Sequence, residues 1–323
     1  MLKRFARVFA AAASAVFCVA ALAQNFPSHP VRIIVPYAPS GNIDITARTL
    51  SQAFSEALGQ SVIIENRAGA GGTIGTGFVA RAPADGYTLL LGSSGTVTAG
   101  PAVYKNLPYD ATRDLVPVGA IQSVPMVLTA GPKTPVTNFK ELLAYAKTKG
   151  SPLSMASAGS GSSNHLALEL FARETHLQVL HVPYKGSGPA LTDLLGGQVE
   201  TMIDQMTSSI EHIRGGRLKA LAVTSLKRSP QLPNVPTLDE LGVAGFEATT
   251  FSGLFAPTGT PPAVLEKLQV ALKKALSIES VRERYRSMGV EMMDMSPAEF
   301  AAFVRADLEK WRKVAREANI VLD

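Results

Sequence analysis

The chain repeats one order of local patterns, and this order constrains its fold more than any other feature. A short apolar run, a turn rich in glycine and serine, and a segment with helical periodicity follow one another along the sequence. Strands that alternate with helices predict an α/β fold, in which helices cover a mostly parallel sheet. The predicted strands are 31–35, 61–65, 88–91, 116–121, 153–157, 179–182, 199–203 and 218–224. The predicted helices are 44–58, 164–174, 190–195, 261–276, 279–288 and 297–319.

Residues 1–23 have the three parts of a secretory signal peptide. Basic residues stand near the start, an apolar stretch covers 8–19, and a small-x-small motif at 21–23 precedes Gln24. The basic residues are Lys3, Arg4 and Arg7. Because the apolar stretch is too short to span a bilayer, we expect cleavage and export to the periplasm. The alternative is a retained N-terminal anchor.

Cleavage of the signal peptide would remove the cysteine and three basic residues, and this argues against thiol chemistry and nucleic-acid binding. Cys18, the only cysteine in the sequence, lies in the predicted signal peptide, so the mature protein has no disulfide and no thiol chemistry. The three basic residues leave with it, and the formal net charge falls from +5 to +2. Since the sequence also has no run of basic residues interleaved with aromatic ones, nucleic-acid binding is not expected.

Four turns rich in glycine and serine carry the functional signal. They are 39–44, 92–96, 158–163 and 184–189. A helix that follows such a turn exposes unpaired backbone N–H groups and roughly half a positive charge at its amino end, and glycine lets a ligand approach the backbone. Ligands of open α/β sheets bind at the carboxyl ends of strands, so turns that face one cleft predict a carboxylate site. The alternative for each turn is an ordinary helix cap.

Enzyme signatures are absent or incomplete. Residues 69–75 read Gly-Ala-Gly-Gly-Thr-Ile-Gly, which lacks the spacing of the dinucleotide-binding G-x-G-x-x-G motif and predicts a tight helix-entry turn. The sequence has no Walker A pattern and no G-x-S-x-G elbow, and its histidines lack metal-ligand spacing. An exported hydrolase that uses Ser94 or Ser162 with His165 is the alternative left open.

Six long segments resemble, in order, the Bug family, which comprises the extracytoplasmic binding proteins of tripartite tricarboxylate transporters. The resemblance runs from about Phe26 to the C-terminus. The segments are PVRIIVPYAPSGNIDITAR, IIENRAGAGGTIGT, DGYTLLLGSSGTVTAGPAVYKNLPYD, SAGSGSSNHLALELF, VPYKGSGPALTDLLGGQVE and LKALAVTSLKRSPQLPNVPTLDELG.

The resemblance implies a two-lobed periplasmic binding protein of type II, each lobe a mostly parallel sheet flanked by helices. It places one lobe at 24–122 plus 222–323 and the other at 123–221. The implied ligand is a small carboxylate: a di- or tricarboxylate, an acidic amino acid or an aromatic acid. The implied partners are two integral membrane transporter subunits, with no enzyme activity, no cofactor and no metal. A periplasmic sensor module, which would present the ligand to a signalling receptor, is a further alternative.

The first turn matches the family's carboxylate-binding loop, which usually reads Pro-Gly-Gly-x-x-Asp. Here the loop is Pro39-Ser40-Gly41-Asn42-Ile43-Asp44. Ser40 departs from the pattern: it adds a hydroxyl donor and restricts the backbone, so the ligand class of relatives need not transfer. Asn42 would add a side-chain amide. Asp44 either contacts the ligand or a bound water, or only complements the amino end of the helix.

The resemblance also assigns ligand binding to residues of the other turns. His165 is either a ligand contact or a packed or capping residue, and Lys185 either offers a positive charge to a dianion or is a solvated surface lysine. Asp204 either selects an amine or a hydroxyl, or bonds to a neighbouring backbone N–H. The expected ligand-binding residues are Tyr37, Pro39, Ser40, Gly41, Asn42, Asp44, Ser93, Ser94, Gly95, Thr96, Ala158, Gly159, Ser160, Gly161, Ser162, His165, Tyr184, Lys185, Gly186 and Asp204.

Overall fold

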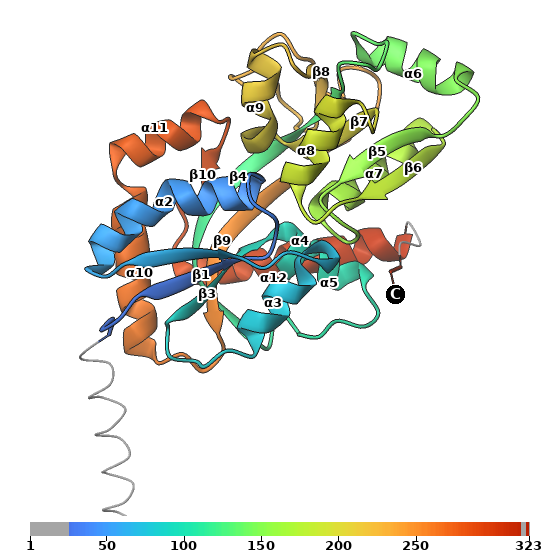
Figure 1. Cartoon of the computed structure of the whole chain (residues 1–323). Coiled ribbons are helices and arrows are strands. Elements are labelled where there is room, and N and C mark those ends of the chain that lie inside the picture. The colour runs from blue at the N-terminus through green and yellow to red at the C-terminus, as the bar shows by residue number, and fades with distance from the viewer. Residues whose placement is uncertain (1–25, 318–320, 323) are drawn as a thin grey trace, which may run out of the picture.

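The computed structural model describes residues 26–317 and 321–322, so the predicted signal peptide lies outside the described residues. The strands within this part of the chain are β1 (Val31–Val35), β2 (Val62–Asn66), β3 (Thr88–Ser93), β4 (Leu115–Ala130), β5 (Leu153–Ser157), β6 (Val179–Pro183), β7 (Thr201–Gln205), β8 (Lys219–Val223), β9 (Thr249–Pro257) and β10 (Glu291–Met292). They form one sheet in the order β2-β1-β3-β9-β4-β7-β5-β6, with β8 and β10 paired to β4 (Figure 1).

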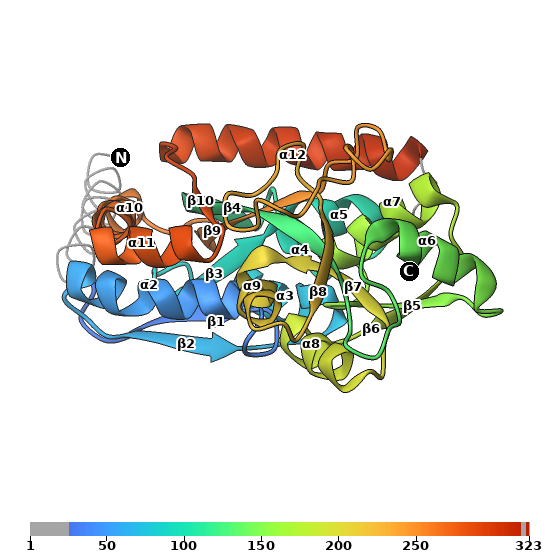
Figure 2. The same ribbon diagram turned by 90° about the horizontal axis from the view of Figure 1, so that it is seen from above.

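Helices cover both faces of this sheet. Alternate residues of a strand point to opposite faces, and in β1 and β3 both sets are buried. Ile33 and Leu89 pack in the core with α2 and α10, whereas Ile34 and Leu90 pack with α3 and α12. Figure 2 shows α12 along one side of the molecule and β2 on the opposite side. The helices are α2 (Asn42–Leu58), α3 (Thr73–Ala80), α4 (Ser94–Val97), α5 (Ala99–Val103), α6 (Phe139–Thr148), α7 (Ser163–Thr175), α8 (Ser187–Gly196), α9 (Met206–Arg214), α10 (Pro262–Leu276), α11 (Glu279–Ser287) and α12 (Pro297–Glu317).

The predicted alternation of strands and helices is confirmed, and the sheet is mixed. β1 pairs in parallel with β2 and β3, and β5 pairs in parallel with β6 and β7. The two central strands, β4 and β9, run antiparallel to each other and to their other neighbours. The sequence predicts only 116–121 of β4 and does not predict β9, and these two strands account for the antiparallel part of the sheet.

β4 passes from one group of strands to another. Its residues up to Pro125 pair with β9, and its residues from Met126 pair with β7. The change of partner falls at Pro125, which has no backbone N–H to donate to a ladder. In Figure 1, β4 runs from the group that contains β1 and β3 into the group that contains β5 and β7. We call these groups, with their helices, the first half and the second half. The lobe boundaries at 122/123 and 221/222 stay a prediction.

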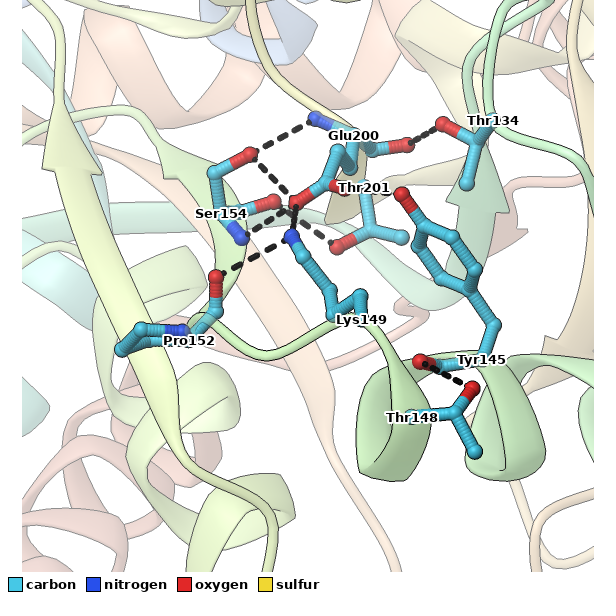
Figure 3. Close-up of polar contacts among 8 residues, drawn as sticks. All are labelled: Thr134, Tyr145, Thr148, Lys149, Pro152, Ser154, Glu200 and Thr201. Atoms are coloured by element: carbon cyan, nitrogen blue, oxygen red, sulfur yellow. Dashed lines mark hydrogen bonds and ion pairs between the residues drawn. The ribbon is translucent and has the colours of Figure 1, made fainter.

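A partly buried carboxylate attaches α6 to the second half (Figure 3). Glu200, next to β7, accepts hydrogen bonds from Lys149 Nζ, from Tyr145 Oη at 2.7 Å, and from the backbone N and the Oγ of Ser154 at 2.8 and 2.9 Å. Burial raises the pKa of Glu200, but these hydrogen bonds outweigh burial and hold the pKa below its usual value. The ionised carboxylate therefore joins the end of α6, β5 and the start of β7.

We predict that Glu200→Ala lowers the free energy of unfolding by about 2–3 kcal/mol, because several hydrogen bonds to an ionised group are lost. The loss should shrink in acid. The folded-state pKa is depressed, so the stabilisation is present above the unfolded pKa of about 4.3 and is lost as the pH falls through the folded value. Urea denaturation at pH 7 and pH 3 measures both effects.

The matched control is Glu174→Ala, which removes an exposed ion pair with Arg173. Exposed pairs contribute little, so this change should cost less than about 0.5 kcal/mol. An equal loss for Glu200→Ala at both pH values would contradict the proposed role of the ionised carboxylate.

Candidate ligand-binding site

The four predicted turns meet at one cavity between the two halves. Each turn contributes to its wall, and none of the lining residues, all of which the structure describes, has a charged side chain. The cavity is lined by Tyr37, Gly41, Asn42, Ile43, Ser93, Ala158, Ser163, Asn164, Ser187, Gln205 and Thr250. Hydroxyl and amide groups therefore provide most of its polar surface.

Four helices begin at this cavity. α2 begins at Asn42, α7 at Ser163 and α8 at Ser187, while α9 follows directly after Gln205. The N-cap residues of α2, α8 and α9 make no side-chain hydrogen bond to the first helical turn. Since the first N–H groups of a helix have no intrahelical partner and carry partial positive charge, backbone donors from both halves concentrate at one place.

The turns of the two halves are in backbone contact. Tyr104 Oη donates to the Ser160 carbonyl at 2.7 Å. A Cβ atom added at Gly71 would lie 1.9 Å from the same carbonyl oxygen, and one added at Gly188 would lie 2.1 Å from the carbonyl oxygen of Pro39. Only glycine allows this approach, so the cavity is closed by main chain on both sides.

In the first turn, three of the predicted residues line the cavity: Tyr37, Gly41 and Asn42. Burial raises the pKa of Tyr37 to about 12, so its phenol keeps its proton at neutral pH. Pro39 and Ser40 are exposed and do not line the cavity. Ser40 has a φ of 67°, in the left-handed region where the family pattern has glycine.

Asp44 supports the first turn and does not line the cavity. Its carboxylate accepts from Ser40 N and Arg48 Nε, both at 2.9 Å, and from Asn66 Nδ2 at 2.9 Å. Burial raises the pKa of Asp44, but these bonds outweigh burial and hold the pKa below its usual value. The carboxylate therefore stabilises the strained backbone at Ser40 through the hydrogen bond that it accepts from Ser40 N.

In the second turn, Ser93 lines the cavity. Its neighbours shape the turn: Ser94 Oγ accepts from a backbone N–H of β9 at 2.9 Å, and Thr96 Oγ1 accepts from Ser93 N at 3.0 Å. A Cβ atom at Gly95 would lie 2.9 Å from Ser163 N, so Gly95 permits contact with the third turn. Of the four predicted residues here, only Ser93 faces the cavity.

In the third turn, Ala158 lines the cavity. Gly159 has a φ of 122° and donates its N–H to Ser157 Oγ at 3.1 Å. The carbonyl of Ser160 receives the hydrogen bond from the first half, and Ser162 is the N-cap of α7. These residues set the path of the turn without lining the cavity.

His165 lies behind the third turn. Its Nδ1 accepts from Gly161 N at 3.1 Å, and its Nε2 lies 3.2 Å from a carboxylate oxygen of Glu169. The ring stacks on His181 with centroids 4.0 Å apart. Burial, together with the nearby His165, lowers the pKa of His181 to about 4, and its Nε2 lies 2.6 Å from Ser157 Oγ. Both ring nitrogens of His165 are thus engaged away from Ser94 and Ser162.

In the fourth turn, none of the three predicted residues lines the cavity. Tyr184 Oη donates to Asp193 at 2.7 Å. The side chain of Lys185 is exposed, and its carbonyl accepts a backbone N–H from the first half at 2.9 Å. Gly186 is the N-cap of α8 with a φ of 142°. The next residue, Ser187, is the one that faces the cavity.

Asp204 is fully buried beneath the cavity wall. Its Oδ1 accepts from Ser187 Oγ at 2.6 Å and from Asn164 Nδ2 at 3.0 Å, and its Oδ2 accepts from Ser208 Oγ at 2.5 Å and Ser209 Oγ at 2.9 Å. Burial raises the pKa of Asp204 above its usual value, and the four hydrogen bonds, which act to lower it, offset this only in part. The carboxylate joins the amino ends of α7, α8 and α9 and orients two residues that line the cavity.

The sequence prediction missed several lining residues. Ser163, Asn164 and Ser187 occupy the first turn of the helix after a predicted glycine-serine turn, so the same helix-end signal covers them. Gln205 and Thr250 carry no such signal, because only the pairing of β7 and β9 with β4 brings them to the cavity. Within the described part of the chain, no group of three or more His, Cys, Asp or Glu residues could hold a metal ion.

Comparison with known proteins identifies the family. Residues 46–320 match the family model described as "Tripartite tricarboxylate transporter family receptor" (TctC). The chain belongs to this family. A relative, protein BugT of Bordetella pertussis, is 40% identical over 301 residues, which cover 93% of this chain and 92% of BugT. The predicted membership of the Bug family is confirmed.

Solved structures confirm the α/β periplasmic binding protein fold. The periplasmic binding protein BugD has a TM-score of 0.89 and 40% identity, with 92% of this chain and 99% of BugD covered. R. palustris Rpa4515 with adipate has a TM-score of 0.87 and 36% identity, with 92% and 99% covered. MatC from Rhodopseudomonas palustris with bound malate has a TM-score of 0.85 and 35% identity, with 90% and 99% covered.

We predict that Asp204→Ala lowers the free energy of unfolding by about 3–4 kcal/mol, because four buried donors each lose an acceptor and the hydroxyls of Ser187 and Ser209 keep no other. The control is Asp193→Ala, which removes a single hydrogen bond from Tyr184 and should cost about 1 kcal/mol. Urea denaturation curves compare the two variants. If Asp204→Ala costs no more than the control, the carboxylate does not organise the three helix ends.

Proposed function

We propose that this protein binds a small carboxylate between its two lobes in the periplasm and delivers it to a tripartite tricarboxylate transporter. The observation that supports this most strongly is the meeting of four helix amino ends, from both halves, at one cavity lined by neutral donors. Helix amino ends bind anions through their free N–H groups and partial positive charge. We propose a di- or tricarboxylate, an acidic amino acid or an aromatic acid as the ligand.

The chemistry of the lining residues fits a carboxylate held by hydrogen bonds. Tyr37, Ser93 and Asn42 line the cavity from the first half, and the uncapped amino ends of α8 and α9 expose backbone N–H groups from the second, so an acid between them would meet donors from both halves. Hydrogen bonds to an ionised group are about twice as strong as neutral ones, and they strengthen when water is excluded. A buried arginine is therefore not needed to hold an anion here.

The solved relatives support the ligand class. The neighbours named with adipate and with malate hold a dicarboxylate and a hydroxydicarboxylate, respectively. For this chain we propose the lobes 24–122 plus 222–323 and 123–221, two integral membrane transporter subunits as partners, and export by the signal peptide at 1–23. Among the described residues, no helix is both long and apolar enough to cross a bilayer.

The alternatives have less support. A hydrolase that uses Ser94 or Ser162 needs a free ring nitrogen of His165, and both are engaged by Gly161 N and Glu169. The family and fold are those of solute-binding proteins. A periplasmic sensor module would share the binding step and differ only in its partner.

We predict that at least one carboxylate raises the melting temperature of the exported chain, residues 24–323, because a ligand that binds only the folded state stabilises it. Malate, succinate, adipate, citrate, glutamate and nicotinate form the panel, with ATP as the negative control. Isothermal titration calorimetry then gives the dissociation constant. No binding across the panel, or turnover of an ester or amide of a bound acid, would overturn the proposed function.

We predict that Gly188→Ala keeps the two halves from the contact that they make in this structure and weakens carboxylate binding about tenfold or more, since affinity falls with the population of the form that can bind. The new Cβ would lie 2.1 Å from the carbonyl oxygen of Pro39 in the first half, whereas alanine suits the backbone of α8 itself. The control is Gly196→Ala in the same helix, where a Cβ meets nothing within 4 Å. Calorimetry and the radius of gyration from small-angle scattering measure the effect; unchanged affinity would contradict closure at this contact.

A further inference from the structure

A buried glutamine lies behind the first turn. Gln122 is on β4, three residues before the strand changes partners, and its side chain is fully buried. Its Nε2 lies 3.0 Å from Asn42 Oδ1 and 2.8 Å from Thr46 Oγ1. It therefore reaches from the central strand to the first turn of α2, where Asn42 faces the cavity.

The direction of these hydrogen bonds follows from Thr46. Its hydroxyl lies 2.7 Å from the backbone carbonyl oxygen of Asn42, which can only accept, so the hydroxyl proton points there. The Thr46 oxygen must then accept from Gln122, which identifies the facing end of the Gln122 amide as its NH₂ group. The same NH₂ group also donates to the side chain of Asn42, so the Asn42 atom that accepts this hydrogen bond is the side-chain oxygen, Oδ1.

Because Oδ1 of Asn42 faces Gln122, the NH₂ group of Asn42 points away from Gln122. The side chain is only 4% exposed and lines the cavity, and its Nδ2 has no hydrogen-bond partner among the described residues. Without the hydrogen bond from Gln122 to Oδ1, the Asn42 amide would be free to turn its oxygen toward the ligand instead. An oxygen in that place would repel a carboxylate, whereas an N–H group binds it.

We propose that Gln122 and Thr46 are positioning residues that fix Asn42 with its N–H donors toward the ligand. The inference rests on the proposed function, because it assumes that the ligand presents a carboxylate to Asn42. It extends the site to a central strand of the sheet, since Gln122 does not itself line the cavity.

The unfavourable placement of Gln122 supports a functional role. Its Oε1 is buried without a partner among the described residues, and so is the Oγ of Ser252, its register neighbour on β9. A buried polar atom without a partner destabilises the folded state, and an apolar side chain of similar volume would avoid this. A purely structural position on a central strand favours such an apolar side chain.

The test compares Gln122→Met with the wild type by calorimetry. The probe is whichever of malate, adipate, succinate and citrate the wild type binds most tightly; a wild type that binds none of them overturns the proposed function itself. We expect Gln122→Met to weaken binding about tenfold, as for the loss of a hydrogen bond to a charged group. We also expect its melting temperature without ligand to be unchanged or higher. Equal affinity, within twofold, would overturn the positioning role.

A double-mutant cycle separates positioning from general disturbance of the site. In an Asn42→Ala background, Gln122→Met should have no further effect on affinity, because the group that it orients is gone. Independent, additive losses would overturn the proposal. Ser252→Ala is the matched control: it removes the neighbouring buried hydroxyl without contact to Asn42, and its affinity should equal that of the wild type. Thr46→Val provides a second variant, with a loss in the same direction.

Discussion

Backbone-to-backbone contact between the two halves is the constraint on which the site depends. Four helix amino ends can surround one small cavity only if the turns before them come within van der Waals distance of one another. Gly71, Gly95 and Gly188 meet this demand, because a Cβ at any of them would collide with main chain from the opposite half. Gly95 and Gly188 lie in turns that the sequence presents as approach points for a ligand, and here they serve the approach of one half to the other, as does Gly71 in the predicted helix-entry turn.

Two buried carboxylates, one in each half, stabilise the backbone and the helix ends around the cavity. Asp44 holds the strained backbone of the first turn, and Asp204 gathers the amino ends of α7, α8 and α9. Neither carboxylate lines the cavity. The pKa of Asp44 is held below its usual value, so its ionised carboxylate offsets part of the positive potential at the start of α2. The cavity face is left to neutral hydroxyl and amide groups, whose directions decide what it recognises.

The sequence located the turns around the candidate cavity, although most of the individual residues that it proposed there do not line the cavity. Helix caps are local, so the turns at 39–44, 92–96, 158–163 and 184–189 could be found without knowing the fold, and all four contribute to the cavity wall. The predicted strand 116–121 covers less than half of β4, because Gln122, Ser123 and Pro125 interrupt the apolar run and only pairing with β9 and β7 continues the strand to Ala130. β9 has Gly253 at its centre and no alternation, since both of its faces are buried. The role of Gln122 depends on the pairing of β4 with β9, so no local pattern reveals it.

The path of β4 has a consequence for how the molecule behaves as a whole. One continuous strand pairs with β9 on one side of Pro125 and with β7 and β8 on the other, so each half lacks a complete sheet without it. Neither half is an excisable module, and the two should melt in a single cooperative step. Evolutionary exchange of one lobe for another would have to cut through the middle of a strand, which favours diversification by point substitution around the cavity.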